Sequence, residues 1–257
     1  MRTTLKVAVL SLTLLALGSG AYADTISIGS YGTNSNGTGY TASAGFKNTA
    51  LQFLGTAVMP ANEQDGYSGA LAALSAPIKV TTASTSTTSY DTVFDNVWNP
   101  AISGTSWVTN TSVSGPACSG SQCDANAFYY YSTTFTAVGG GEGYDGSLSV
   151  MADDTAEVLL NGKVIMNFGA IGNDGHCSIG PPSCGSVDTI SLSGIQLIAG
   201  TNTLEIINAQ TGLSGAGVDF SANLTRAPEP SSLLLLGTGL LGLAFGLYRK
   251  RVLVPHE

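Results

Sequence analysis

Short runs in which apolar and polar residues alternate fill most of the chain between residues 24 and 226. Residues 25–28 and 147–152 alternate with a period of two, as half-buried strands do. The apolar runs 157–160 and 163–166 flank Asn161-Gly162. Asn-Gly between two such runs predicts a hairpin, because both residues accept the positive φ of a type I′ turn.

Further strand candidates follow from apolar, aromatic and threonine content along the same region. They cover residues 51–54, 78–81, 128–137, 204–208 and 217–224, and two tryptophans lie close together in the segment 91–108. No convincing amphipathic helix lies outside the two ends of the chain. Many short strands with glycine-rich turns predict an all-β fold, a β-sandwich of the exported body.

The chain begins with the pattern of a secretory signal peptide. A basic start at residues 1–6 precedes the apolar core 7–17, and Ala21-Tyr22-Ala23 closes the segment. This order predicts a signal peptide helix at residues 1–23, export through the Sec machinery and cleavage after Ala23. The exported body then covers residues 24–226, a length that suits one domain.

A second apolar segment lies near the other end, between a proline-rich triplet and a basic cluster. Pro228-Glu229-Pro230 precedes the uncharged run 231–248, and Arg249-Lys250-Arg251 follows it. As a helix this run would span roughly 27 Å, enough for a bilayer core. We therefore expect a transmembrane helix at 231–248, a cytoplasmic tail at 252–257 and the body on the outer side, because basic residues stay in the cytoplasm.

The three-part segment 227–251 resembles the PEP-CTERM sorting signal of Gram-negative bacteria. Pro228, Glu229 and Pro230, the apolar helix and Arg249, Lys250 and Arg251 carry the resemblance. It implies that an exosortase in the inner membrane recognises the segment, cleaves near the triplet and passes the protein to the cell surface or the extracellular space. The tail 252–257 is longer than the few basic residues usual for such signals.

The charge of the body bears on its partners. Four basic residues against fifteen acidic ones leave residues 24–226 with a net charge of −11. Nucleic acid and anionic lipid both require clustered lysine and arginine, so this balance argues against both as partners. The acidity favours solubility and mutual repulsion at a surface.

Four cysteines lie in the exported body, as Cys118 and Cys123 and as Cys177 and Cys184. An even number in an oxidising compartment indicates two disulfides. Three pairings are open, and the two local ones are favoured because each pair brackets a turn-rich segment. Zinc bound by the same cysteines with His176 is the alternative, but the spacing fits no standard finger.

A second resemblance covers residues 90–225. The order of Trp107, the aromatic strand ending at Phe135, Asp153-Asp154, Asn161-Gly162 and residues 200–204 is similar to that of galactose-binding-like jelly rolls. Domains of that kind recur in surface proteins with this sorting signal and as carbohydrate-binding modules attached to glycosidases. The resemblance implies a jelly-roll ectodomain and a saccharide as a candidate ligand.

The body contains little that points to catalysis. Its single histidine, His176, sits beside Cys177, and no nucleophile elbow is present. A non-enzymatic surface or matrix protein is therefore the leading interpretation, with no cofactor required. A carbohydrate-binding module, for which exopolysaccharide is the expected ligand, is the alternative. A glycan hydrolase ranks third, because paired carboxylates need a separation that sequence does not supply.

Two groups of residues are candidates for ligand contact. Trp98, Trp107, Tyr129 and Tyr131 could stack on a sugar ring, although filling the core is the better expectation for any single ring. Tyr129 and Tyr131 share one face of an alternating strand. Asp153 and Asp154 are turn residues in the leading interpretation and ligands of a structural calcium ion in the minority one.

Overall fold

The computed structural model describes residues 24–31, 46–48, 50–59, 78–92, 98–112, 124–138, 143–170, 177–212, 214–226 and 237–245. Two units are distinguished, and each is treated by itself. Thr25–Thr225 forms one compact unit, and the two ends of the chain, Met1–Asp24 and Arg226–Glu257, form the other.

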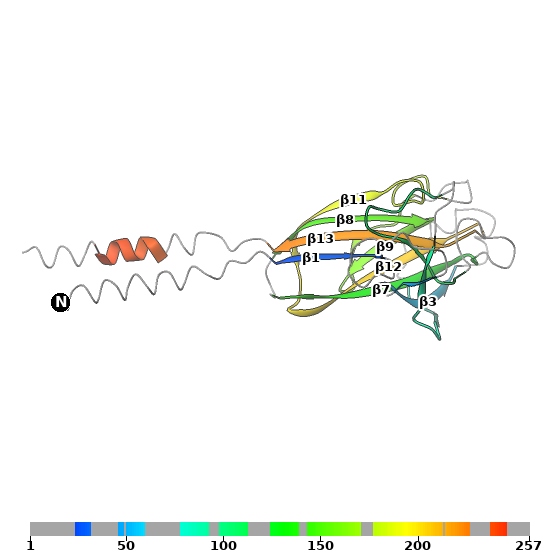
Figure 1. The fold of residues 1–257 in the computed structure, drawn as a ribbon, viewed down its shortest axis with the longest axis horizontal. Helices are drawn as coiled ribbons and strands as arrows, with labels where there is room; N and C mark the ends of the chain where they lie inside the picture. Colours follow the sequence, from blue (N-terminus) through cyan, green and yellow to red (C-terminus); the bar gives the residue numbers. More distant parts are fainter. Residues whose placement is uncertain are drawn as a thin grey trace, which may run out of the picture. The chain divides into compact units, whose positions relative to one another are not determined.

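The compact unit consists of two mostly antiparallel sheets (Figure 1). In the first sheet the strand order is β11 (Asp188–Gln196), β8 (Gly143–Asp153), β13 (Gly217–Arg226), β6 (Trp107–Thr109), β5 (Ser89–Thr92) and β2 (Phe46–Asn48), and β1 (Thr25–Gly29) pairs with β13. In the second sheet the order is β10 (Lys163–Met166), β9 (Thr155–Leu160), β12 (Gly200–Gln210), β7 (Ala127–Ala137), β3 (Gln52–Val58) and β4 (Thr82–Ala83). The predicted all-β sandwich is confirmed.

The Asn-Gly hairpin forms where the sequence predicts it. β9 ends at Leu160 and β10 begins at Lys163, and the two turn residues have φ values of 50° at Asn161 and 76° at Gly162. The Asn161 side chain also ties the turn to β12, because its Oδ1 accepts a bond from the Thr203 amide at 2.9 Å. Local turn chemistry therefore fixes this hairpin and its register.

The main hydrophobic core lies between the sheets. Tyr131 and Ile206 from the second sheet meet Leu148 and Phe220 from the first in one buried cluster. Alternation along β7 behaves as predicted, since Tyr129 and Tyr131 join this core while Tyr130 packs on the opposite face with Ile207. The second sheet therefore also carries buried apolar side chains on its outer face.

Two tryptophans in contact lie in the cluster that covers the outer face of the first sheet. The rings of Trp98 and Trp107 lie 4.4 Å apart and pack with Met151 and Cys184. Cys184 forms a disulfide with Cys177, as predicted, and this bond closes the loop beside the tryptophans. Cys118, Cys123 and His176 lie outside the described residues.

Some predicted elements differ from the observed ones. The strand predicted at 78–81 is wrong, because residues 78–80 are irregular and the pairing with β3 begins at β4. β11 was not predicted, although Ile190 and Leu192 alternate along it. Its ladder with β8 is interrupted between Leu192 and Ile195, and this irregularity hides the pattern.

The unit formed by the two ends of the chain contains a described helix at 237–245, whose Leu240, Leu243 and Phe245 side chains are exposed. Within the part of the chain that is described, no helix reaches the length and apolarity that a bilayer crossing needs. The predicted signal peptide and most of the sorting segment, including Pro228, Glu229, Pro230, Arg249, Lys250 and Arg251, lie outside the described residues. The transmembrane helix at 231–248 therefore stays a prediction.

Candidate functional site

The four aromatic rings named as sugar contacts are interior residues. The exposed fraction is 2% for Trp98, 1% for Trp107, 4% for Tyr129 and 0% for Tyr131. Stacking on a pyranose needs an open ring face, and these rings offer none in this structure. Their indole and phenol groups serve the fold instead: Trp107 Nε1 donates to the Asn99 carbonyl at 2.9 Å, and Tyr129 Oη donates to the Ala125 carbonyl at 2.8 Å.

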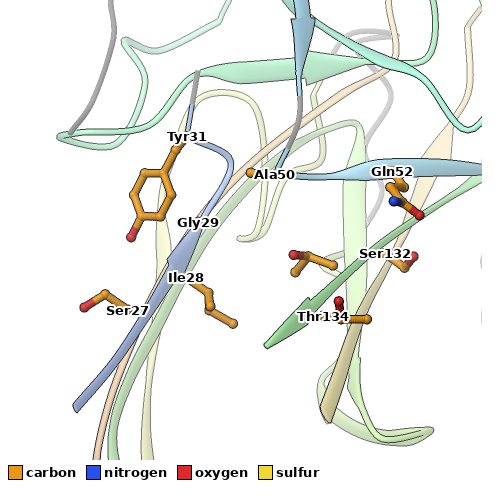
Figure 2. A pocket seen from close by; sticks show the side chains of 9 residues that line it. Ser27, Ile28, Gly29, Tyr31, Ala50, Gln52, Ser132 and Thr134 are labelled. Carbon is orange, nitrogen blue, oxygen red and sulfur yellow. The ribbon is translucent and has the colours of Figure 1, made fainter. Parts of the chain in front are cut away.

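An open pocket lies elsewhere, between the edges of the two sheets. It has a volume of about 300 Å³ and is lined by Ser27, Ile28, Gly29, Tyr31, Ala50, Gln52, Ser132, Thr133 and Thr134. Figure 2 shows two walls, one from β1 with Tyr31 and one from β3 and β7 with Gln52, Ser132 and Thr134. The volume is at the lower end of the range for ligand sites.

Most of the side chains that line this pocket are polar, and Figure 2 shows Ser27 and Tyr31 at the β1 wall and Gln52, Ser132 and Thr134 at the other wall. Ser27 Oγ donates to Asn223 Oδ1 at 2.7 Å, which leaves its lone pairs available as acceptors. Gln52 and Thr134 are exposed, and Ser132 is half-buried. Burial raises the pKa of the Tyr31 phenol, so that side chain stays neutral at physiological pH.

Buried hydrogen bonds hold the two walls of the pocket together. Asn48 Nδ2 donates to the Tyr31 carbonyl at 2.8 Å and to Asp91 Oδ1 at 2.6 Å. Asn48 Oδ1 accepts from the amides of Ala50 and Leu51, both at 2.9 Å. One side chain therefore fixes the end of the β1 wall against the start of the β3 wall.

A second polar region lies where β8 of the first sheet crosses to β9 of the second. Asp153 and Asp154 are both buried there, and the peptide bond between them is cis. Trp98 Nε1 donates to Asp153 Oδ2 at 2.5 Å. Asp154 Oδ2 accepts from the Thr211 amide at 2.7 Å and from the Thr211 hydroxyl at 2.5 Å. The two carboxylates thus join the crossover to the tryptophan cluster and to the end of β12.

Two amide side chains from β12 lie in the same region. Asn208 and Gln210 are fully buried on the strand face that points between the sheets. Asn208 Nδ2 donates to the Gly217 carbonyl at 2.8 Å, and Gly217 lies against the Trp98 ring. Within the described residues, Asn208 Oδ1 and Gln210 Oε1 accept no hydrogen bond. Buried acceptors of this kind normally bond to a protein group, a water molecule or an ion.

This region has the oxygen donors that calcium prefers, although it contains few charged ligands. Calcium takes six to eight oxygens from carboxylates, amides and carbonyls. Among the described residues, no three His, Cys, Asp or Glu side chains gather as a metal-binding group.

A third buried carboxylate, Asp219, ties β1 to the outer face of the first sheet. Ser30 Oγ donates to its Oδ1 at 2.7 Å, and the Ile102 amide donates to its Oδ2 at 2.7 Å. Burial raises the pKa of the Asp219 carboxyl to about 6 from 3.8, against the opposing effect of these hydrogen bonds and of a bond from Thr105. Ser30 directly precedes Tyr31, so this network also supports the pocket wall.

Comparison with known proteins finds a match in the C-terminal segment. The family described as the PEP-CTERM protein-sorting motif matches residues 226–250, so the chain carries that motif. The match covers about a tenth of the chain. Among curated proteins, none matches the sequence.

Several solved structures resemble the β-sandwich at low identity. The GH26-CBM35 β-(1,4)-mannanase of Podospora anserina is 22% identical with a TM-score of 0.32, and the match covers 54% of this chain and 25% of the mannanase. A family 35 carbohydrate-binding module from Clostridium thermocellum is 12% identical over 52% of this chain and 88% of the module, with a TM-score of 0.29. Another, from an environmental isolate, is 17% identical over 72% and 98%, with a TM-score of 0.26. TM-scores this low give no basis for transferring a ligand to this chain.

Proposed function

We propose that this chain is a non-enzymatic protein of a Gram-negative bacterium that an exosortase processes for display on the cell surface or in the extracellular matrix. The observation that carries the proposal is the sorting motif at residues 226–250. The body that precedes the motif is acidic, all-β and disulfide-bonded, as is common in exported proteins. The Sec machinery, the exosortase and the inner membrane are then its partners during transit.

The ends of the compact unit support this route. β1 pairs with β13 from Thr25 opposite Thr225 to Gly29 opposite Ser221, and the Arg226 amide donates to the Asp24 carbonyl at 2.8 Å. Cleavage after Ala23 leaves β1 whole, and a cut near Pro228–Pro230 leaves β13 whole. Both processing steps therefore remove segments without breaking a strand of the sandwich.

The roles of the buried carboxylates support a non-catalytic body. Asp91, Asp153, Asp154 and Asp219 each accept hydrogen bonds from side chains or amides of neighbouring segments. A general acid or base has to reach a substrate proton. These carboxylates are buried and join strands or loops, which is a structural role.

Mass spectrometry of the surface-located protein tests the sorting proposal. We expect a mature chain that begins at Asp24 and ends before residue 231. Glu229→Ala should leave uncleaved precursor in the membrane fraction. The control Glu205→Gln, which removes a carboxylate on β12 instead, should not. An intact Tyr248–Glu257 on the protein recovered from the cell surface would contradict the proposal.

We propose saccharide binding as a second function of the body. The specific observation in its favour is the pocket between β1, β3 and β7, where hydroxyl and amide groups surround one aromatic ring. That combination is suited to hydroxyl-rich ligands, because the ring contacts apolar sugar faces and the polar groups bond to hydroxyls. Retention of the full chain in affinity gels that contain polysaccharide tests it. Migration unchanged by every polysaccharide would refute this function.

We further propose that Asp153, Asp154, Asn208 and Gln210 hold a structural calcium ion. The two buried amide oxygens without a donor support it, because a cation would satisfy both. A bound ion would join the crossover between the sheets to β12. Saturating calcium stabilises such a protein by about 3 kcal/mol at a hundredfold excess over Kd.

Thermal unfolding in calcium and in a chelator tests the metal proposal. Calcium should raise the Tm of the wild-type chain, and Asn208→Leu should abolish that increase. Asn223→Leu, an amide change on the distant half of β13, serves as the control and should keep it. An equal Tm in calcium and chelator would exclude the ion.

A further inference from the structure

The residues that line the pocket between β1, β3 and β7 indicate which class of saccharide it would accept. None of its nine described lining residues is charged. Five of them offer hydroxyl or amide groups on short side chains, namely Ser27, Gln52, Ser132, Thr133 and Thr134, and Tyr31 adds a phenol. These groups both donate and accept hydrogen bonds, as a ligand rich in neutral hydroxyls requires.

The Tyr31 ring is held in a defined place at the β1 wall. A Cβ added to Gly29 would lie 3.1 Å from both Cε1 and Cζ of Tyr31, so the ring rests directly on the Gly29 backbone. The carbonyl of Tyr31 is fixed by Asn48, and Ser30 before it is fixed by Asp219. Figure 2 shows the ring standing at the side of the pocket across from Gln52 and Ser132. A held ring binds a sugar face at less entropic cost than a mobile one.

The charge around the pocket bears on which glycans can enter. The body has a net charge of −11, and none of the described residues that line the pocket is basic. A carboxylate or sulfate on a glycan would enter without a counter-ion and against repulsion from the body. Recognition of anionic groups normally uses arginine or lysine.

We infer that this pocket binds one or two residues of an uncharged glycan and excludes acidic polysaccharides. This inference rests on the second proposed function, saccharide binding by the body. Tyr31 stacks on the sugar face, and Gln52, Ser132 and Thr134 bond to hydroxyls from the opposite wall. The volume of about 300 Å³ limits the bound portion to a short stretch of the chain.

Affinity electrophoresis of the full chain, in a detergent without a sugar headgroup, tests the inference. The neutral probes are dextran, galactomannan and xyloglucan, and the acidic probes are alginate and polygalacturonate. We expect retention by at least one neutral probe and by neither acidic one. Tyr31→Ala should weaken that retention about tenfold or more, Tyr31→Phe should largely keep it, and Thr134→Ala should weaken it about three- to tenfold.

Thr136 supplies the matched control, because it lies two residues along β7 on the same strand face and outside the pocket lining. Thr136→Ala should leave retention unchanged. Thr134→Lys places a cation at the pocket and should create retention by alginate, whereas Thr136→Lys should not. Near-ultraviolet circular dichroism confirms that each variant keeps the packing of the buried aromatic side chains.

The outcomes separate the inference from the function on which it rests. Retention by a neutral probe that survives Tyr31→Ala and Thr134→Ala would overturn the pocket and leave saccharide binding in place. Retention of the wild-type chain by alginate or polygalacturonate would overturn the exclusion of acidic glycans. An absence of retention by all five probes would overturn both proposals.

Discussion

Asp219 makes the stability of the sandwich depend on pH in a direction opposite to that of a salt-bridged carboxylate. The side chain is fully buried, and its pKa is raised to about 6 from 3.8 chiefly by burial. A raised pKa means that the folded protein binds this proton more tightly than the unfolded chain. The stabilisation is therefore complete below about pH 3.8 and is lost as the pH rises through about 6.

The magnitude follows from the size of the pKa shift. A difference of about 2 pKa units corresponds to about 3 kcal/mol, of which about 2–3 kcal/mol is lost between about pH 4 and about pH 7. Asp219→Asn removes this titration and keeps the shape of the side chain. The free energy of unfolding of the wild type, minus that of Asp219→Asn, should fall by that amount over this range. Other carboxylates titrate in both proteins and cancel in the difference.

Urea denaturation at a series of pH values, with disulfides intact, measures this quantity. Trp98 and Trp107 are buried and in contact, so their fluorescence reports unfolding of the outer face on which Asp219 lies. Asp188→Asn, which replaces a half-buried carboxylate at the start of β11 in the same sheet, serves as the control and should follow the wild type. A difference between wild type and Asp219→Asn that stays constant within about 0.5 kcal/mol would refute the reasoning.

Three further predictions concern the fold. Gly146→Ala should destabilise the protein by about 3 kcal/mol or more in the same urea assay, because the added Cβ would lie 1.9 Å from the Asn223 carbonyl oxygen. The control Gly185→Ala adds a Cβ in open space and should leave the free energy of unfolding nearly unchanged. Replacing Cys177 and Cys184 together by serine should cost about 2–3 kcal/mol, since the bond closes a short loop, and an unchanged denaturation midpoint under non-reducing conditions would argue against it. Asn161→Val should lower the stability by about 1–2 kcal/mol in thermal unfolding, because a β-branched residue disfavours a φ of 50° and two side-chain hydrogen bonds to β12 are lost. An equal loss of stability in Val164→Thr would show that the turn is not the cause.

Elements that depend on local chemistry could be predicted from the sequence. The hairpin between β9 and β10 follows from Asn161-Gly162, and the alternation along β7 places Tyr129 and Tyr131 on the core face. β11 was not predicted, because its pairing with β8 is interrupted after Leu192 and the alternation of apolar and polar residues does not continue. The pairing of β4 likewise has no sequence signal, since Thr82 and Ala83 lie in a serine- and threonine-rich tract.

The candidate site depends on contacts that the sequence does not encode locally. Trp98 and Trp107 are buried because a loop and the Cys177–Cys184 disulfide cover the outer face of their sheet. No local sequence pattern predicts that these segments cover it. Tyr31 precedes a stretch of loop composition, and its partners Gln52 and Thr134 follow much later in the chain. Only the pairing of distant strands brings these residues to one pocket.

The place of β1 in the sheet links this pocket to export. β1 supplies one wall of the pocket, and its strand partner is β13, the last strand of the sandwich. The Asp219 side chain that fixes Ser30 also comes from β13. Because β13 is the last strand of the sandwich and leads directly into the sorting motif, the proposed export route would complete the wall that carries Tyr31 only after the end of the body has crossed the membrane. Under the two proposals, export and saccharide binding, the pocket would form on the side of the membrane where polysaccharide is present.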